Sequence, residues 1–123
     1  QKTWIGPYVI LDGSGKLNIG NNCSISAGVH IYTHNSVKWA VSGGKAPYDY
    51  LPTTIGNNCF IGPHAIIQMG VIIGDNSIVG ANSFVNSNLP PNSISVGSPA
   101  KTIGRVTVDK DGGVSLIYNE TQS

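Results

Sequence analysis

The sequence predicts an all-β fold, a parallel β-helix whose short strands wind around a three-sided prism. Two observations predict it: aliphatic residues recur every six positions, and glycine or asparagine often follows them. A short strand and a sharp corner together take about six residues, so three sides close one coil and coils stack about 4.8 Å apart. Glycine and asparagine suit corners with positive φ. An α-helix cannot produce this pattern, because a step of six walks around its surface.

The aliphatic anchors of the six-residue step are expected to point into the prism and to stack in three columns. An ordinary β-sandwich is the alternative, but sandwiches keep no strict six-residue register. The predicted columns are Ile19, Ile55 and Ile73; Ile5, Ile25, Ile61 and Val79; and Leu11, Ile31, Ile67 and Val85.

The register is interrupted in three places. The step from Leu11 to Ile19 is eight residues, which predicts a bulged corner around residues 13–15. From residue 37 to about 54 the repeat stops, which predicts a long loop extruded from one corner. Such loops are more often functional than not. After Val85 the register fades.

The C-terminal residues predict a β-hairpin. Beyond Gly104, residues alternate on both sides of Asp111-Gly112-Gly113, as in two strands joined by a tight turn. The hairpin is expected to cover the open end of the helix, whose last strands would otherwise leave an exposed edge. We therefore expect a single domain over 1–123, with coils over 1–104 and a hairpin and tail over 105–123.

The composition narrows the partners and the compartment. Charged residues make up 11% of the chain and the net charge is +1, without a basic run, so neither nucleic acid nor an anionic membrane surface is expected. No run of 18 apolar residues predicts a membrane span, and no signal or transit peptide is visible, so the expected location is the cytoplasm. Cys23 and Cys59 occupy equivalent positions of adjacent coils; stacked reduced thiols are expected, with a disulfide as the alternative.

The coil register brings polar side chains to the mouth of the extruded loop. His34 follows the third column there, and Asp12 lies on the same face one coil earlier. A neutral imidazole can remove a proton from an alcohol at neutral pH, so His34 is the candidate general base, with a solvent-facing corner histidine as the alternative. Asp12 is a candidate acceptor ligand, a group that orients His34, or a plain turn aspartate.

Three aromatic residues lie in the predicted loop. Trp39, Tyr48 and Tyr50 suit stacking on a sugar ring or on a neighbouring subunit, and loop aromatics also simply hold loops in place. We take Trp39 and Tyr48 as candidate acceptor-binding residues. His30 and His64 are expected at the surface, where His64 could line a cofactor groove.

Two segments carry a family resemblance. IGNNCFIGPHAIIQMGVIIGDNSIVGANSFV, followed by LPPNSISVGSPAKTIG, is similar to the hexapeptide-repeat sugar O-acetyltransferases, which include the galactoside and maltose acetyltransferases and sugar-modifying enzymes of lipopolysaccharide and capsule synthesis. The resemblance covers roughly residues 4–105, and Gly97–Lys101 is its most specific part. It implies a left-handed coil, acetyl-CoA as co-substrate without a metal, and homotrimers with active sites between subunits.

The resemblance also implies roles for residues. The family's catalytic histidine stands just before the extruded loop, where this chain reads I-Y-T-H-N-S, so the role falls on His34; Asp12 resembles the family's acceptor-contacting acidic residue. Acetyl-CoA lies along a groove between two prisms in the family. The implied cofactor-binding residues are Gly62, Gly80, Ala81, Gly97, Ser98 and Lys101. The family's Thr-Lys pair for the CoA phosphates is replaced by Asn86-Ser87-Asn88, which leaves Lys101 and Arg105 as the candidates.

The favoured function is acetyl-CoA-dependent O-acetylation of a sugar hydroxyl in surface polysaccharide synthesis. Xenobiotic and serine acetyltransferases are the alternatives within this class. A γ-class carbonic anhydrase would bind zinc through three histidines, but Gln68 or Met69 stands where a second histidine ligand is needed. A non-catalytic β-helix scaffold is the remaining alternative.

Overall fold

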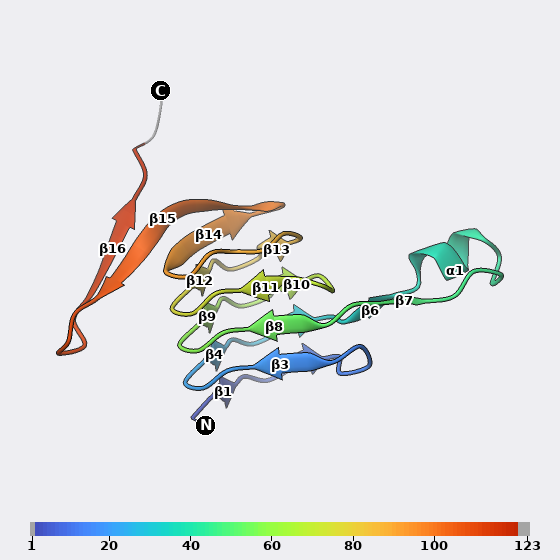
Figure 1. Cartoon of the computed structure of the whole chain (residues 1–123), viewed down its shortest axis with the longest axis horizontal. Helices are drawn as coiled ribbons and strands as arrows, with labels where there is room; N and C mark the ends of the chain where they lie inside the picture. Colours follow the sequence, from blue (N-terminus) through green and yellow to red (C-terminus); the bar gives the residue numbers. More distant parts are fainter. Residues whose placement is uncertain (1, 121–123) are drawn as a thin grey trace.

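The computed structural model describes residues 2–120, and it is a three-sided β-helix whose coils stack from the N-terminus to the C-terminus (Figure 1). Three sheets form its sides. The seven-stranded sheet has the order β1 (Trp4–Ile5), β4 (Ser24–Ile25), β9 (Phe60–Ile61), β12 (Ile78–Val79), β14 (Ser93–Gly97), β15 (Ala100–Val108) and β16 (Val114–Tyr118). The four-stranded sheet contains β2 (Ile10–Leu11), β5 (His30–Ile31), β10 (Ile66–Ile67) and β13 (Phe84–Val85). The three-stranded sheet contains β3 (Leu17–Ile19), β8 (Thr53–Ile55) and β11 (Ile72–Ile73).

The strand registers confirm all three predicted columns of anchors. Ile25 pairs with Ile5 and Ile61 in parallel register, and the other columns pair in the same way. From Ile25 onward the anchors are almost fully buried, whereas Ile5 in the first coil is 46% exposed. The difference arises because each later coil is covered by a coil on both sides, so the stacking itself buries the core.

One corner is built from asparagines. Asn22, Asn58, Asn76 and Asn92 precede successive strands of the seven-stranded sheet, each with a φ of 58–60°. The Asn58 side-chain amide donates to Asn76 Oδ1 at 3.1 Å, and Asn76 donates to Asn92 Oδ1 at 3.2 Å. Asparagine tolerates the left-handed conformation that the corner requires, and its amide links neighbouring coils.

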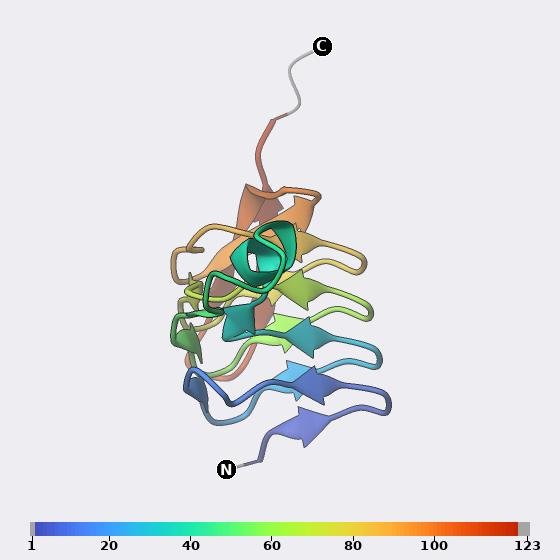
Figure 2. The same cartoon turned by 90° about the vertical axis from the view of Figure 1, so that its right-hand side faces the viewer.

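The insertion departs from the loop expected over 37–54. Residues 34–52 form an extruded ribbon, in which β6 (His34–Asn35) pairs antiparallel with β7 (Asp49–Tyr50) and α1 (Val37–Val41) forms the end (Figures 1 and 2). Thr53 and Thr54 belong to β8 instead. The buried Thr53 hydroxyl donates to the Tyr32 carbonyl at 2.8 Å and accepts from the Gly70 N–H at 3.0 Å, which holds the chain in the coil.

The coil continues beyond Val85, where the sequence predicted a fading register. Leu89 is buried and forms a parallel bridge with Ile73, and Ser95 pairs with Val79. The step from Val85 to Leu89 is four residues, and the step to Ser95 is six again. A shortened corner therefore shifts the repeat without ending it.

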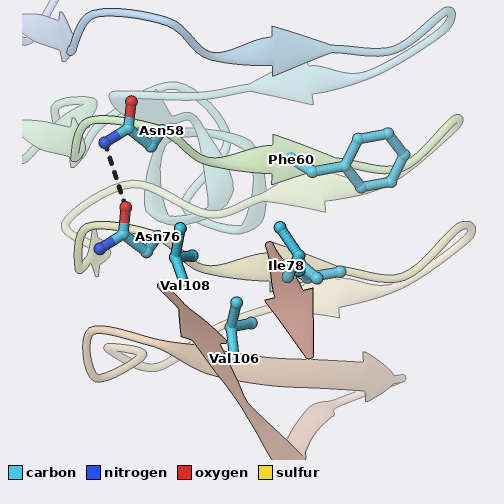
Figure 3. A pocket seen from close by; sticks show the side chains of 7 residues that line it. Asn58, Phe60, Asn76, Ile78, Val106 and Val108 are labelled. Carbon is cyan, nitrogen blue, oxygen red and sulfur yellow. Dashed lines mark hydrogen bonds between the residues drawn. The ribbon is translucent and has the colours of Figure 1, made fainter. Parts of the chain in front are cut away.

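The predicted C-terminal hairpin forms beyond Gly104: β15 and β16 pair antiparallel from Gly104 with Tyr118 to Val108 with Val114, around a turn at residues 109–113. Strand β15 starts at Ala100, pairs antiparallel with β14 and so covers its edge, and then pairs with β16. Beside the seven-stranded sheet, Val106 and Val108 line a groove of about 440 Å³ together with Phe60 and Ile78 (Figure 3). Val114 of β16 also lines this groove. Residues 121–123 of the expected tail lie outside the described residues.

Candidate active site

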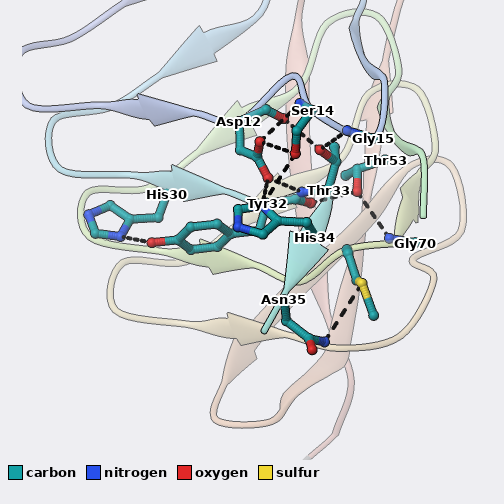
Figure 4. A network of polar contacts seen from close by, with 11 residues as sticks. Asp12, Ser14, Gly15, His30, Tyr32, Thr33, His34, Asn35, Thr53 and Gly70 are labelled. Atoms are coloured by element: carbon teal, nitrogen blue, oxygen red, sulfur yellow. Dashed lines mark hydrogen bonds and ion pairs between the residues drawn. The ribbon is translucent and has the colours of Figure 1, made fainter. Parts of the chain in front are cut away.

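His34 and Asp12 lie together, as the coil register predicted. His34 begins β6 at the corner where the strands of the four-stranded sheet end, and about one third of its side chain (32%) is exposed. Asp12 follows β2 one coil earlier, and its Oδ2 directly contacts His34 Nδ1 (Figure 4). The fold therefore brings an imidazole and a carboxylate together at the base of the extruded ribbon.

The Asp12 carboxylate is surrounded by hydrogen-bond donors. Its Oδ1 accepts from the Ser14 N–H at 3.0 Å and from the Ser14 hydroxyl at 2.7 Å, and its Oδ2 accepts from the Thr33 N–H at 2.9 Å. Partial burial tends to raise the pKa of Asp12, but the hydrogen bonds from Thr33, Ser14 and His34 outweigh it and hold the pKa well below its usual range. Asp12 is therefore an anion at neutral pH.

This carboxylate fixes the tautomer of His34. An ionised carboxylate can only accept a hydrogen bond, so Nδ1 of the imidazole must carry the proton. The other nitrogen, Nε2, then holds a free lone pair. The arrangement presents a base at Nε2 and a nearby anion that can stabilise the imidazolium formed when Nε2 takes up a proton.

The bulged corner after Leu11 holds the pair in place. The hydroxyl of the buried Thr33 accepts from the Gly15 N–H at 2.8 Å and donates to the Asp12 carbonyl at 2.9 Å. A Cβ on Gly15 would collide with the Thr33 carbonyl oxygen. Sequence reasoning did not identify Ser14 or Thr33, although the eight-residue step marked this corner as unusual.

Aromatic rings line the side of His34. Tyr48 stacks on it at a centroid distance of 6.0 Å with 8° between the planes, and Tyr50 stacks at 6.1 Å and 29°. Trp39 meets the ring of Tyr48 edge-on at 5.7 Å. Tyr32, which the sequence did not single out, meets His34 edge-on at 6.4 Å. The structure thus places Tyr48 beside the imidazole and Trp39 behind Tyr48.

The predicted cofactor-binding residues share a different corner. Gly62, Gly80 and Gly97 end or follow successive strands of the seven-stranded sheet, and a Cβ on Gly62 would lie only 2.6 Å from the Ala81 nitrogen. Ser98 lies in the turn between β14 and β15, and Lys101 pairs with Val96. This corner precedes the four-stranded sheet, whereas His34 follows it. The six positions lie together, but at the opposite edge of that sheet from His34.

The other histidines and the cysteines lie apart from this pair. His64 is exposed and its ring covers Gly28, while the half-buried His30 shares a 2.9 Å hydrogen bond between Nδ1 and the Tyr32 hydroxyl. Cys23 and Cys59 are buried free thiols, and burial raises the pKa of Cys59 to about 11. Among residues 2–120, no three His, Cys, Asp or Glu side chains converge as metal ligands, and no helix is long and apolar enough to cross a bilayer.

Comparisons with known proteins point in one direction. Residues 52–87 match the family described as hexapeptide repeat of succinyl-transferase. The chain is 30% identical over 131 residues to galactoside O-acetyltransferase of Escherichia coli K12, covering 90% of this chain and 64% of that relative. The chain thus spans less than two thirds of the length of that protein.

Two solved structures give the same picture. A hexapeptide-repeat acetyltransferase of Vibrio cholerae, complexed with acetyl-coenzyme A, superposes with a TM-score of 0.74 at 32% identity, covering 82% of this chain and 55% of that one. Galactoside acetyltransferase in complex with coenzyme A superposes with a TM-score of 0.69 at 32% identity, covering 84% and 55%.

Proposed function

We propose that this chain, which is similar to the hexapeptide-repeat acetyltransferases, is a member of that family and transfers an acetyl group from acetyl-CoA to a sugar hydroxyl, with His34 as the general base. The observation that carries this proposal is the contact of His34 Nδ1 with the Asp12 carboxylate, which leaves Nε2 free to accept a proton. The named relative is an acetyltransferase of galactosides, and the two solved relatives hold acetyl-coenzyme A or coenzyme A.

In the proposed reaction, the acceptor hydroxyl attacks the thioester carbonyl while its proton passes to Nε2 of His34. A C–O bond forms, the tetrahedral intermediate collapses, the C–S bond breaks, and the proton passes on to the departing CoA sulfur. In this proposal Asp12 holds the imidazole in position and stabilises its protonated form, so we favour the orienting role of Asp12 over acceptor binding. No covalent enzyme intermediate is needed.

The acceptor is proposed to bind between the base and the extruded ribbon. The exposed rings of Trp39 and Tyr48 suit the apolar face of a sugar, whose hydroxyls then point toward solvent and toward His34. A sugar of surface polysaccharide or lipopolysaccharide synthesis is the preferred acceptor, and a cytoplasmic location is part of the same proposal.

A homotrimer would complete this site. Acetyl-CoA is proposed to lie along the corner that contains Gly62, Gly80, Ala81 and the Gly97–Lys101 turn, with Lys101 and Arg105 near its phosphates. In one chain this corner and His34 lie at opposite edges of the four-stranded sheet. A neighbouring copy can bring its cofactor corner to this chain's His34. We therefore propose that the active sites lie between subunits, and that each subunit is a left-handed coil.

The test is CoA release over a panel of sugars, antibiotics and serine at saturating acetyl-CoA. His34→Ala is expected to lower turnover by about two to four orders of magnitude. Lys110→Ala is the control, because Lys110 is exposed in the turn between β15 and β16, away from both His34 and the proposed cofactor corner. Unchanged turnover in His34→Ala would remove the histidine from the mechanism. CoA release with only serine or an antibiotic as acceptor would show that the acceptor is not a sugar.

A melting assay separates an enzyme from a scaffold. CoA should raise the melting temperature of the wild-type protein, because a ligand that binds only the folded state stabilises it. A non-catalytic scaffold would show no shift at millimolar CoA.

A further inference from the structure

Tyr50 of β7 and Tyr48, which lies just before this strand, both stack on the proposed base. Tyr50 pairs with His34 across the ribbon, and Tyr48 lies two residues away on the same side. Their ring centroids lie 6.1 Å and 6.0 Å from that of His34, with interplanar angles of 29° and 8°. The two phenol rings are themselves 6.5 Å apart and inclined by 26°. Both rings therefore turn a face toward the imidazole.

A ring stacked on a general base acts differently before and after proton transfer. The face of a phenol ring carries partial negative charge and attracts a cation whose centre lies within about 6 Å. Neutral imidazole gains little from this field, whereas imidazolium gains more. Since His34 becomes charged as it removes the proton, the contact strengthens toward the transition state, which is the condition for raising turnover.

We propose that Tyr48 and Tyr50 are positioning residues that stack on His34 and stabilise its protonated form during proton transfer. This rests on the proposed function, because it assumes that His34 is the base. It deepens that function, since Tyr48 would then act on the base as well as on the acceptor, and Tyr50 gains a role.

The effect of the two rings on His34 can be distinguished from the effect of nearby charged groups, because few such groups surround the imidazole. From the bulged corner, Asp12 contacts His34 Nδ1 and the Ser14 hydroxyl lies 3.4 Å from it; from its own strand, Tyr32 meets the ring edge-on. On the ribbon, Lys38 and Asp49 pair with each other at 3.6 Å. Asp12 is thus the charge in direct contact with the imidazole, so variants that keep Asp12 isolate the contribution of the rings.

The ribbon does not need the rings of Tyr48 and Tyr50 to stay in place. Tyr48 and Tyr50 remain 40% and 54% exposed, so neither belongs to a buried core. The base of the ribbon is already fixed by the Leu51 N–H bond to the Thr33 carbonyl at 3.0 Å and by the buried Thr53 hydroxyl. Removing the phenol rings should therefore leave the ribbon folded.

The direct test is a pH titration of the histidine ring signals by NMR, with His34 assigned by loss of its signal in His34→Gln. In Tyr48→Leu/Tyr50→Leu, the midpoint for His34 should fall by about half a pH unit, because the cation loses its ring faces. Tyr48→Phe/Tyr50→Phe should keep the wild-type midpoint. Equal midpoints in all three proteins would overturn the proposal.

Kinetics give the second readout. In the double leucine variant, kcat should fall about three- to tenfold and the acidic limb of kcat/KM should move to lower pH, whereas the double phenylalanine variant should restore both. A rise in KM for the acceptor with an unmoved limb would mean that the tyrosines only bind the acceptor, and the proposal would be wrong.

The NMR titration needs no turnover, so it tests the stacking even if no acceptor releases CoA and the proposed function fails. Should the double leucine variant lose its native circular dichroism spectrum, Tyr50→Leu alone is titrated, with the same direction of shift expected and an unmoved midpoint counting against the proposal.

Discussion

The prism and the extruded ribbon are stabilised in different ways. In the prism, anchors such as Ile25, Ile31 and Ile61 are completely buried, and each coil repeats the contacts of the last. In the ribbon, no residue from 34 to 52 is buried, and the segment is held by one short ladder and a few hydrogen bonds. The prism sets the positions of Asp12 and His34, and the ribbon places aromatic rings beside His34.

Substitutions in the two regions should therefore affect different measured quantities, namely stability in the prism and turnover at the base of the ribbon. A change inside the prism should reduce stability, because it leaves a cavity in a closely packed column. A change at the base of the ribbon should reduce turnover, because it alters the orientation or protonation of His34 while burying or exposing little apolar surface.

The largest expected effect is on the prism. Ile61→Ala should lower the free energy of unfolding by about 2–5 kcal/mol, measured by urea denaturation. Ile72→Ala is the control, because Ile72 is 52% exposed on the outside of a neighbouring sheet and should cost far less. Equal losses of unfolding free energy in the two variants would show that inward-facing and outward-facing isoleucines contribute equally to stability.

At the base of the ribbon, Asp12→Asn should lower kcat about ten- to a hundredfold with a small loss of stability. The amide can donate to Nδ1, which would favour the tautomer with its proton on Nε2 and so remove the free lone pair. CoA release measures the effect. Ser14→Ala removes only one of the hydrogen bonds to Asp12 and should give a smaller loss; a larger one would mean that Ser14 contacts substrate.

The same carboxylate predicts a dependence of stability on pH. The pKa of Asp12 is lower in the folded protein than its ordinary value, so its ionised form stabilises the fold at pH values above the unfolded pKa of about 4. This stabilisation is lost as the pH falls through the folded pKa. The difference in unfolding free energy between wild type and Asp12→Asn should therefore shrink steadily below about pH 4, and a difference that grows there would contradict the depressed pKa.

The smallest effect is expected at the far end of the ribbon. Val41 in α1 is 81% exposed, so Val41→Ser should change the unfolding free energy by less than about 0.5 kcal/mol. A melting curve is sufficient to check this. A large fall in melting temperature would mean that α1 is buried against a second copy of the chain.

The sequence was most informative where geometry repeats. A closed three-sided coil permits little besides a six-residue step, so the columns through Ile25, Ile31 and Ile55 could be read directly. The six-residue step did not reveal the coil that follows Val85, because the corner before Leu89 is two residues shorter than the others. It also could not reveal α1, because five residues are too few to show a helical period.

The candidate site was predictable to the same extent. Asp12 and His34 could be placed together because they follow the same face in successive coils. The donors from Ser14 and Thr33 depend on the local shape of the bulged corner, which the repeat does not encode. The stacking of Tyr50 on His34 depends on the register of β6 with β7, and no repeat specifies that register either.

The chain leaves the prism after Thr33 and returns at Thr53 without shifting the pairing of Ile19 with Ile55. An insertion that enters and leaves at one corner places no demand on its own length or composition. Under the proposed function, the outer part of this segment, beyond Asn35 and before Tyr48, is therefore the place where a different acceptor preference can be built without the loss of a core contact or of the base.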